Sequence, residues 1–193
     1  MTTILLARHG ETDWNRDNRF QGHADPPLNE KGRAQAADLS AALAGEQFAA
    51  IYSSPLHRAL ETAEIVAAPH GLEPVSVDGL REVDVGSWQG LTRAEIEQRY
   101  PEQFARWLDH GPGWDDGESY DEMGRRAVAA LLGLARAHDG SRILAVTHGG
   151  PIRAAFAFAD GATHAEARRV GPSIGNTFVA EFAVEDDALR RLD

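Results

Sequence analysis

Residues 4–10, ILLARHG, and residues 143–150, ILAVTHGG, share one organisation near opposite ends of the chain. In each stretch a continuous apolar run is followed by one polar residue, a histidine and a glycine. A short apolar run that ends at glycine is typical of a strand buried on both faces, as in a parallel sheet. The two stretches therefore predict buried strands that emerge into polar loops.

Strand and helix patterns alternate over the rest of the chain. Further strands are expected at residues 50–53, 75–77 and 177–184, and helices at residues 30–44, 55–65, 92–100, 119–140 and 152–159. Helix starts are marked by Asn29 and by two capping boxes, Thr92 with Glu95 and Ser119 with Glu122. The alternation predicts an α/β fold, a three-layer α/β/α sandwich with a mostly parallel central sheet, in a single domain of residues 1–193.

Composition narrows the classes of partner. The formal net charge of -11 argues against nucleic acid and anionic membrane, so any anion-binding site must be local. The longest apolar stretch, residues 127–135, is far shorter than the roughly 18 residues that span a bilayer. The chain has no cysteine, and its start, MTTILLARHG, lacks the features of a signal peptide, so we expect a cytoplasmic location.

Four polar side chains are expected to meet at one edge of the sheet. Arg8 and His9 follow the first strand, Arg58 lies in the first turn of the helix after the second, and His148 follows the strand at residues 143–146. Parallel strands end at the same edge, and helix N-termini there favour an anion. Either histidine alone could be a hydrogen-bonded core residue, and the arginines could form surface ion pairs. The set as a whole favours an anion site, because a buried unpaired charge costs several kcal/mol.

Four blocks of sequence extend this site into a recognisable pattern. They are ARHGETDWN (7–15), SSPLHRALETA (53–63), LREVDVGSWQG (80–90) and VTHGG (146–150). In this order they resemble the histidine phosphatase superfamily, also called phosphoglycerate-mutase-like. The resemblance spans residues 4–150 and leaves the C-terminal strand region without a matching block.

The resemblance implies a role for each residue of this chain that matches a motif of the family. His9 would be the nucleophile that becomes a phosphohistidine, and Arg8, Arg58 and His148 would surround the phosphoryl oxygens. Glu82 would protonate the leaving oxygen and then deprotonate the attacking water. Further phosphate or substrate contacts would come from the loop residues Asn15, Gln21, Gly22 and Gly149. Less favoured alternatives for the acid are Glu11 and Asp84.

Physical chemistry supports these roles independently. Phosphoryl transfer spreads negative charge over three oxygens, which two arginines can bind, so neither a metal ion nor another cofactor is required. His9 needs one unprotonated ring nitrogen, with the other N–H held by an acceptor such as a backbone carbonyl of the following turn. His148 would serve better as a cation. Glu82 must start protonated, which repulsion from the phosphate dianion favours.

Substrate choice is expected to depend on side chains at the mouth of the pocket. The candidates are Trp14, Phe20, His23, Trp88 and Trp114. Residues 110–120, HGPGWDDGESY, could form a mobile lid or an ordinary connection. Asp115 and Asp116 in that segment could repel highly anionic substrates or bind sugar hydroxyls. The other histidines are expected at the surface: His57, His70, His110, His138 and His164.

Three functions are considered. The leading hypothesis is a metal-independent phosphomonoesterase acting on a small phosphorylated metabolite. A cofactor-dependent phosphoglycerate mutase is second, because those enzymes usually carry Glu-Arg-His-Tyr-Gly where this chain has REVDVGSWQG, and are usually longer. A catalytically silent phosphate-binding regulatory protein is third. A metallohydrolase is not favoured, since the chain lacks the HExxH motif. A homodimer formed through an edge strand is left open.

Overall fold

The computed structural model describes residues 1–111 and 113–192 and contains one six-stranded sheet with the order β3-β2-β4-β1-β5-β6. The strands are β1 (Thr2–Arg8), β2 (Ala50–Ser53), β3 (Val75–Ser76), β4 (Arg142–Thr147), β5 (Val179–Glu185) and β6 (Ala188–Leu192). The first four run parallel to one another, and β5 pairs antiparallel with both β1 and β6. The predicted mostly parallel sheet is confirmed. Asp193, the last residue of the predicted domain, lies outside the described residues.

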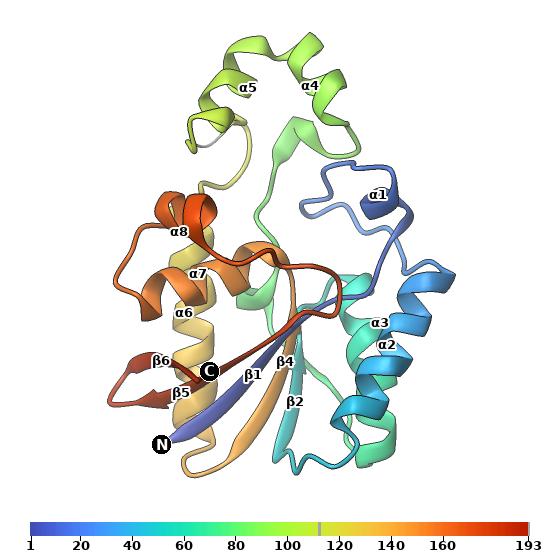
Figure 1. Ribbon diagram of the computed structural model, residues 1–193, viewed down its shortest axis with the longest axis vertical. Helices are drawn as coiled ribbons and strands as arrows, with labels where there is room; N and C mark the ends of the chain where they lie inside the picture. The colour runs from blue at the N-terminus through green and yellow to red at the C-terminus, as the bar shows by residue number, and fades with distance from the viewer. Residues whose placement is uncertain (112, 193) are drawn as a thin grey trace.

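Helices cover both faces of this sheet (Figure 1). They are α1 (Asp13–Arg16), α2 (Glu30–Leu43), α3 (His57–Ala67), α4 (Arg93–Arg99), α5 (Pro101–Leu108), α6 (Tyr120–Ala137), α7 (Gly149–Ala159) and α8 (His164–Val170), with 3₁₀ turns at Ala68–His70, Asp78–Leu80 and Gly86–Trp88. The pair α2 and α3 lies against one face and the pair α6 and α7 against the other. The architecture is therefore the expected three-layer α/β/α sandwich.

The strand β1 shows why its sequence is apolar at every position. Ile4 and Leu6 belong to the core beneath α6 and α7, whereas Leu5 and Ala7 belong to the core beneath α2 and α3. Successive side chains of a strand point to opposite faces, so a strand covered on both sides needs no polar alternation. The strand β4 divides its residues in the same way. The continuous apolar runs are thus a direct consequence of the layered fold.

The predicted helix starts agree with the structure. The Asn29 side chain accepts a hydrogen bond from the Gly32 backbone N–H at 2.8 Å. Both predicted capping boxes are present, at the starts of α4 and α6. Two further boxes, Thr12 with Asn15 and Thr163 with Glu166, begin α1 and α8, which the sequence patterns did not predict.

Several element boundaries differ from expectation. The helix predicted from residue 55 begins at His57, because Leu56 is still extended. The expected helix at 92–100 ends at Arg99, and Pro101 then starts α5. The short helix α1 was also not predicted. The strand expected at 177–184 is β5, and an unpredicted hairpin strand β6 follows it with only Leu189 buried.

The helices α4 and α5 form an extension beyond the carboxyl edge of the sheet (Figure 1). The extension has its own aromatic core, in which the Trp88 ring packs against Phe104, Trp107 and Trp114. Within the described residues, none of the helices combines the length and apolar character needed to cross a membrane.

Candidate active site

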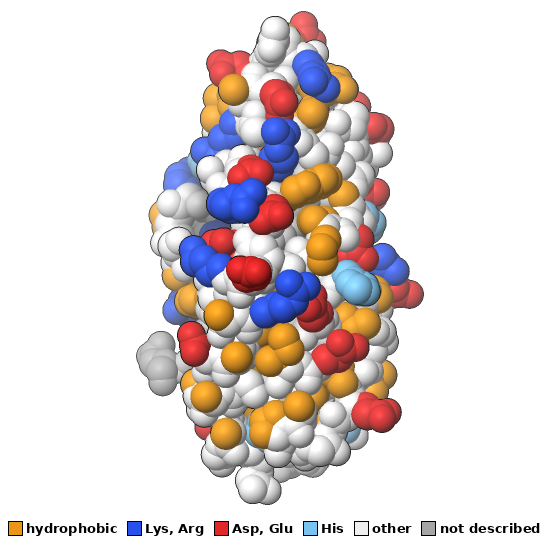
Figure 2. Space-filling model, turned by 90° about the vertical axis from the view of Figure 1, so that its right-hand side faces the viewer, with side chains coloured by type: hydrophobic (Ala, Val, Ile, Leu, Met, Phe, Trp, Pro, Cys, Tyr) orange, Lys and Arg blue, Asp and Glu red, His pale blue; other side chains and the backbone are white. Residues whose placement is uncertain are grey.

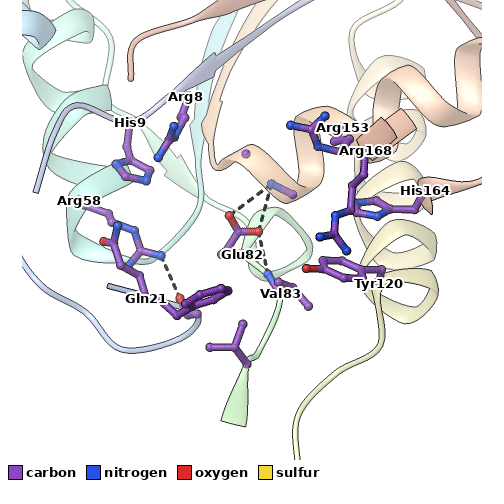
Figure 3. A pocket seen from close by; sticks show the side chains of 15 residues that line it. Arg8, His9, Gln21, Arg58, Glu82, Val83, Tyr120, Arg153, His164 and Arg168 are labelled. Carbon is purple, nitrogen blue, oxygen red and sulfur yellow. Dashed lines mark hydrogen bonds between the residues drawn. The ribbon is translucent and has the colours of Figure 1, made fainter. Parts of the chain in front are cut away.

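A cavity of about 250 Å³ lies between the loops after β1 and β4, the loop at residues 82–85 and the helices α6, α7 and α8. Its lining includes four arginines but only one carboxylate, Glu82. Figure 3 shows two groups of side chains, each with two arginines, on either side of Glu82. We call the first group the near wall (Arg8, His9 and Arg58, with His148 behind them) and the second the far wall (Tyr120, Arg153, His164 and Arg168).

In the near wall, His9 is held as a neutral imidazole. It is only 2% exposed, and its Nδ1–H donates to the Gly10 carbonyl at 2.6 Å. Burial lowers the pKa of His9 well below its usual range, and the charges of Arg58 and Arg8 lower it further. A neutral ring with its proton on Nδ1 has a lone pair on Nε2, which is the state a nucleophile requires.

The glycine after His9 is required by packing. A side chain on Gly10 would collide with the carbonyl of Gly32 in α2. The Gly10 N–H also donates to the Thr62 hydroxyl of α3 at 3.1 Å. The strand β1 therefore ends in Arg-His-Gly because the chain must pass close to two helices while it presents His9 to the cavity.

Of the two near-wall arginines, Arg58 is fully buried and Arg8 is partly buried, and both are tied to backbone carbonyls. Arg8 donates to the Ile174 carbonyl at 2.7 Å, and Arg58 donates to the Ala24 and Gly22 carbonyls at 2.8 and 2.9 Å. Burial lowers the pKa of Arg58 to about 10, so the guanidinium stays charged at neutral pH. Arg58 thus supplies positive charge and also holds the loop that carries Gly22.

His148 lies behind His9, with 5.1 Å between the ring centroids. It is fully buried, and its Nε2 is hydrogen-bonded to the Ser54 hydroxyl at 2.8 Å. Burial, followed by the charges of Arg58, His9 and Arg8, lowers the pKa of His148 well below its usual range. Burial beside two guanidiniums therefore disfavours the cationic form that the sequence reasoning preferred for His148.

Glu82 lies in the loop after the 3₁₀ turn Asp78–Leu80, and its carboxylate faces the cavity beside the start of α7 (Figure 3). Its carboxylate accepts hydrogen bonds from the Val83 N–H at 2.9 Å and from the Gly150 N–H at 3.2 Å. A side chain on Gly150 would collide with this carboxylate. His23 and Arg126 donate to the Glu82 backbone carbonyl at 2.8 and 2.7 Å. The loop that carries Glu82 is therefore held by hydrogen bonds to both the side chain and the backbone of this residue.

Four further candidates line the cavity, and three do not. Phe20, Gln21, Gly22 and Gly149 are in its lining. Asn15 instead accepts the Thr12 N–H at 3.1 Å in the capping box of α1. The ring of Trp14 packs against Gly90, and His23 supports Glu82 from outside the cavity. The two alternative acids, Glu11 and Asp84, are also outside it, and Glu11 pairs with Lys31 at 2.8 Å.

The prediction that Trp88 and Trp114 contact substrate is wrong. Trp88 is fully buried and donates to the Gln103 side chain at 2.9 Å, while Trp114 is 4% exposed and donates to the Glu118 carbonyl at 2.7 Å. Both rings belong to the aromatic core of the extension. An aromatic residue in a glycine-rich segment gives the same sequence pattern whether it packs inward or lines a pocket.

The segment at residues 110–120 packs onto the extension. Trp114 anchors it, and the Glu118 N–H donates to the Asp84 carbonyl at 2.9 Å, which favours an ordinary connection over a lid. Pro112 lies outside the described residues. Asp115 pairs with Arg106, and Asp116 accepts the Ser87 N–H at 3.0 Å. Neither aspartate lines the cavity, so the roles considered for them at the substrate are not supported.

The far wall was missed by sequence reasoning. His164, expected at the surface, is only 7% exposed and stacks on Tyr120 with 4.4 Å between ring centroids. Arg153 of α7 and Arg168 of α8 lie beside this pair (Figure 3). The only available signal was the position of Arg153, one helical turn after the VTHGG block. Among the described residues, no group of three or more His, Asp or Glu side chains is placed to hold a metal ion.

Several known proteins are similar to this chain in sequence and in fold. Phosphoserine phosphatase 1 of Hydrogenobacter thermophilus is 36% identical over 158 residues, which are 81% of this chain and 75% of that protein. A metal-independent phosphoserine phosphatase of Arabidopsis thaliana is 39% identical over 163 residues, which are 81% of this chain and 68% of that protein. The solved structure of YhfR from Bacillus stearothermophilus is 34% identical, with a TM-score of 0.90 over 99% of this chain and 95% of that chain.

The sequence profile of the histidine phosphatase superfamily (branch 1) matches residues 4–192. The chain therefore belongs to the histidine phosphatase superfamily, and it is a phosphatase with a phosphoglycerate-mutase-like fold. The match extends past Gly150, where the blocks recognised in the sequence end, and includes β5 and β6.

Proposed function

We propose that this phosphatase hydrolyses small phosphomonoesters without a metal ion, through a phosphohistidine formed at His9. The observation that carries the proposal is the hydrogen bond from His9 Nδ1–H to the Gly10 carbonyl at 2.6 Å. That bond leaves the Nε2 lone pair of a neutral ring in a cavity shared with Arg8 and Arg58. The nucleophile and the positive charges that would bind the phosphate therefore lie in the same cavity.

In the first half-reaction, His9 Nε2 attacks the phosphorus of the bound ester. The N–P bond forms as the bond from phosphorus to the leaving oxygen breaks, and protonated Glu82 donates a proton to that oxygen. Arg8 and Arg58 stabilise the charge that spreads over the three other oxygens. The Gly10 carbonyl compensates the positive charge that develops on the imidazole.

In the second half-reaction, water replaces the alcohol. Glu82, now ionised, accepts a proton as the water oxygen attacks phosphorus and the N–P bond breaks. Inorganic phosphate is released, and His9 and Glu82 return to their starting forms. General acid and base assistance of this kind is typically worth about 10²- to 10⁴-fold in rate.

Metal independence follows from the supply of positive charge by the protein itself. Four guanidiniums line the cavity, and two of them belong to the near wall around His9. Guanidinium groups bind phosphate oxygens bidentately. They thereby neutralise charge on these oxygens, as metal ions do in other phosphoryl-transfer sites. The name of the Arabidopsis relative, a metal-independent phosphoserine phosphatase, agrees with this part of the proposal.

The test is phosphate release from a panel of phosphomonoesters with EDTA present. We expect turnover by the wild type that is lost in His9→Ala and retained in His57→Ala, which removes an exposed histidine of α3. A base quench during turnover, followed by mass spectrometry, should find one phosphoryl group on the peptide that contains His9. Equal activity of His9→Ala and the wild type would overturn the proposal.

The same assay separates the alternative functions. Phosphoglycerate isomerisation primed by 2,3-bisphosphoglycerate that is faster than phosphate release would identify a mutase. Tight phosphate binding with no turnover of any ester would identify a regulatory protein. Complete inhibition by EDTA, reversed by a divalent metal, would contradict the metal-independent mechanism.

A further inference from the structure

Beyond Glu82, the cavity continues to a second group of cations that the proposed mechanism does not use. Arg153 projects from α7 and Arg168 from α8, and both line the same cavity as His9 (Figure 3). The stacked rings of Tyr120 and His164 form the surface beside them. The far wall therefore faces whatever part of the substrate extends away from the reacting phosphate.

The far-wall arginines have no acidic partner. In the described part of the chain, no carboxylate lies within ion-pair distance of Arg153 or Arg168. Arg153 donates one hydrogen bond, to the Ala167 carbonyl at 3.0 Å, whereas Nη1 of Arg168 is buried without a partner among these residues. Both ring nitrogens of His164 are also buried and unpaired there. Buried donors are normally satisfied, so this concentration of unused donors calls for a ligand.

Aromatic rings hold Arg168 in place. The guanidinium carbon lies 4.9 Å from the centroid of the Tyr120 ring and 5.0 Å from that of Trp107. Such cation–π contacts orient the planar group without neutralising its charge. Burial, and after it the charge of nearby Arg168, lowers the pKa of Arg153. The pair is thus arranged at an electrostatic cost that a bound anion would relieve.

The balance of charge indicates what kind of anion fits. The chain has 30 acidic and 19 basic residues, yet the cavity lining contains four arginines and one carboxylate. With Glu82 protonated, as the first half-reaction requires, a single phosphate dianion would leave two of the four guanidinium charges unbalanced. The charges therefore favour a substrate that carries a second anionic group besides the reacting phosphate.

We propose that Arg153 and Arg168 bind a carboxylate of the substrate while the near wall binds its phosphate, so that the enzyme selects small phosphorylated carboxylic acids. This inference rests on the proposed phosphomonoesterase function. A cavity of about 250 Å³ suits a phosphorylated hydroxy or amino acid of a few carbons. Planar guanidiniums match the two oxygens of a carboxylate in a bidentate geometry.

The test compares two substrates that differ only in the second group. One is 3-phosphoglycerate, and the other is glycerol 3-phosphate, in which a hydroxymethyl group replaces the carboxylate. Hydrogen bonds to a charged group predict that wild-type kcat/KM is about 10- to 100-fold higher for 3-phosphoglycerate. We expect Arg153→Gln and Arg168→Gln each to reduce this ratio towards one, and Arg168→Lys to retain part of it.

Arg169→Gln is the matched control, because Arg169 is the exposed neighbour of Arg168 in α8 and should leave the ratio unchanged. Arg153 makes neither of the ring contacts that orient Arg168, so its variant tests the subsite even where Arg168→Gln proves unstable. Melting temperatures of all variants identify any loss of folding.

Each outcome decides a separate claim. A wild-type ratio near one, or an unchanged ratio in both glutamine variants, would overturn the carboxylate subsite while His9-dependent turnover of p-nitrophenyl phosphate still supported the proposed function. Faster hydrolysis of 1,3-propanediol bisphosphate than of 3-phosphoglycerate would also overturn it, because a second phosphate would then be the preferred anion. Turnover of p-nitrophenyl phosphate that does not depend on His9 would instead refute the proposed function.

Discussion

The near and far walls of the cavity carry similar charges but are built in different ways. The near-wall residues follow strand ends or begin a helix at the edge of the sheet, and Arg8 and Arg58 are tied to backbone carbonyls. The far-wall residues project from α6, α7 and α8 and are held mainly by contacts between rings and guanidiniums. The two proposals thus place the chemistry common to every substrate at the edge of the sheet and the selection of substrate on helix surfaces.

The difference has a measurable consequence. Substitutions in the near wall should slow the hydrolysis of every phosphomonoester, whereas substitutions in the far wall should change the ratio between substrates. The cavity lining also differs from the face shown in Figure 2, where Lys and Arg side chains lie among Asp and Glu side chains. The predictions below test this contrast.

Arg58→Gln should have the largest effect. Loss of one preorganised charge at the transferring phosphate is expected to reduce kcat/KM about 10²- to 10³-fold for all substrates alike. Steady-state kinetics on two unrelated phosphomonoesters measures this. Arg33→Gln, which removes an exposed arginine paired with Glu61, serves as the control. A loss confined to one substrate would contradict the assignment of Arg58 to the near wall.

Gly150→Ala should come next. The added methyl group would occupy the place of the Glu82 carboxylate, and displacement of a reacting group by about 1 Å can cost about 10²-fold in rate. We expect kcat to fall most for esters with poor leaving groups, which depend on the acid. Gly133→Ala, where the added methyl group meets no neighbour, should leave kcat unchanged. Equal kcat values for the two variants would show that Glu82 is not the acid.

A smaller effect is expected in the pH dependence of stability. Burial, with Arg168 and Arg153 nearby, lowers the pKa of His164 to about 4, below its value in the unfolded chain. The unfolded state therefore binds the proton first as pH falls, and stability present above pH 6.5 is lost towards pH 4. Between pH 7 and 5 this should cost about 2 kcal/mol.

Urea unfolding at both pH values checks this expectation. His164→Phe, which retains the stacking on Tyr120, should lose about 2 kcal/mol less stability than the wild type over this range. His57→Gln should follow the wild type, because the His57 side chain is exposed. An identical pH dependence of the wild type and His164→Phe would show that His164 does not titrate in this way.

Asp115→Asn should have the smallest effect. The Asp115 side chain is 68% exposed and pairs with Arg106 away from the cavity. Exposed ion pairs contribute about 0–1 kcal/mol, so the melting temperature should change little and kcat/KM should stay within about twofold for both substrates of the subsite test. A changed preference between those substrates would return Asp115 to the specificity residues considered from the sequence.

Local patterns explain which expectations were confirmed. The apolar runs at residues 4–7 and 143–146 predict buried strands because strands covered on both sides have a distinctive composition. Asn29 and the two capping boxes predict helix starts because a cap is a contact over three residues. The helix α5 was missed because its start depends on where the chain turns at Tyr100, and β6 because it buries only Leu189.

The aromatic residues mark the limit of such reasoning. Trp88 and Trp114 were interpreted as pocket residues but form the core of the extension, while His164 was expected at the surface and lines the cavity. In each case the surroundings come from residues distant in the sequence. Spacing alone cannot distinguish an aromatic ring that faces a ligand from one that faces another helix.

The amino-acid sequence by itself determined the layered α/β fold, the edge at which the site lies and the side chains of Arg8, His9 and Arg58 that meet there. Each of these depends on short-range periodicity or on the rule that parallel strands end at a common edge. Only the tertiary structure decided that burial disfavours the charged form of His148 and that Arg153 and Arg168 line the same cavity as His9. Burial and long-range proximity set both properties, and neither is encoded in neighbouring residues.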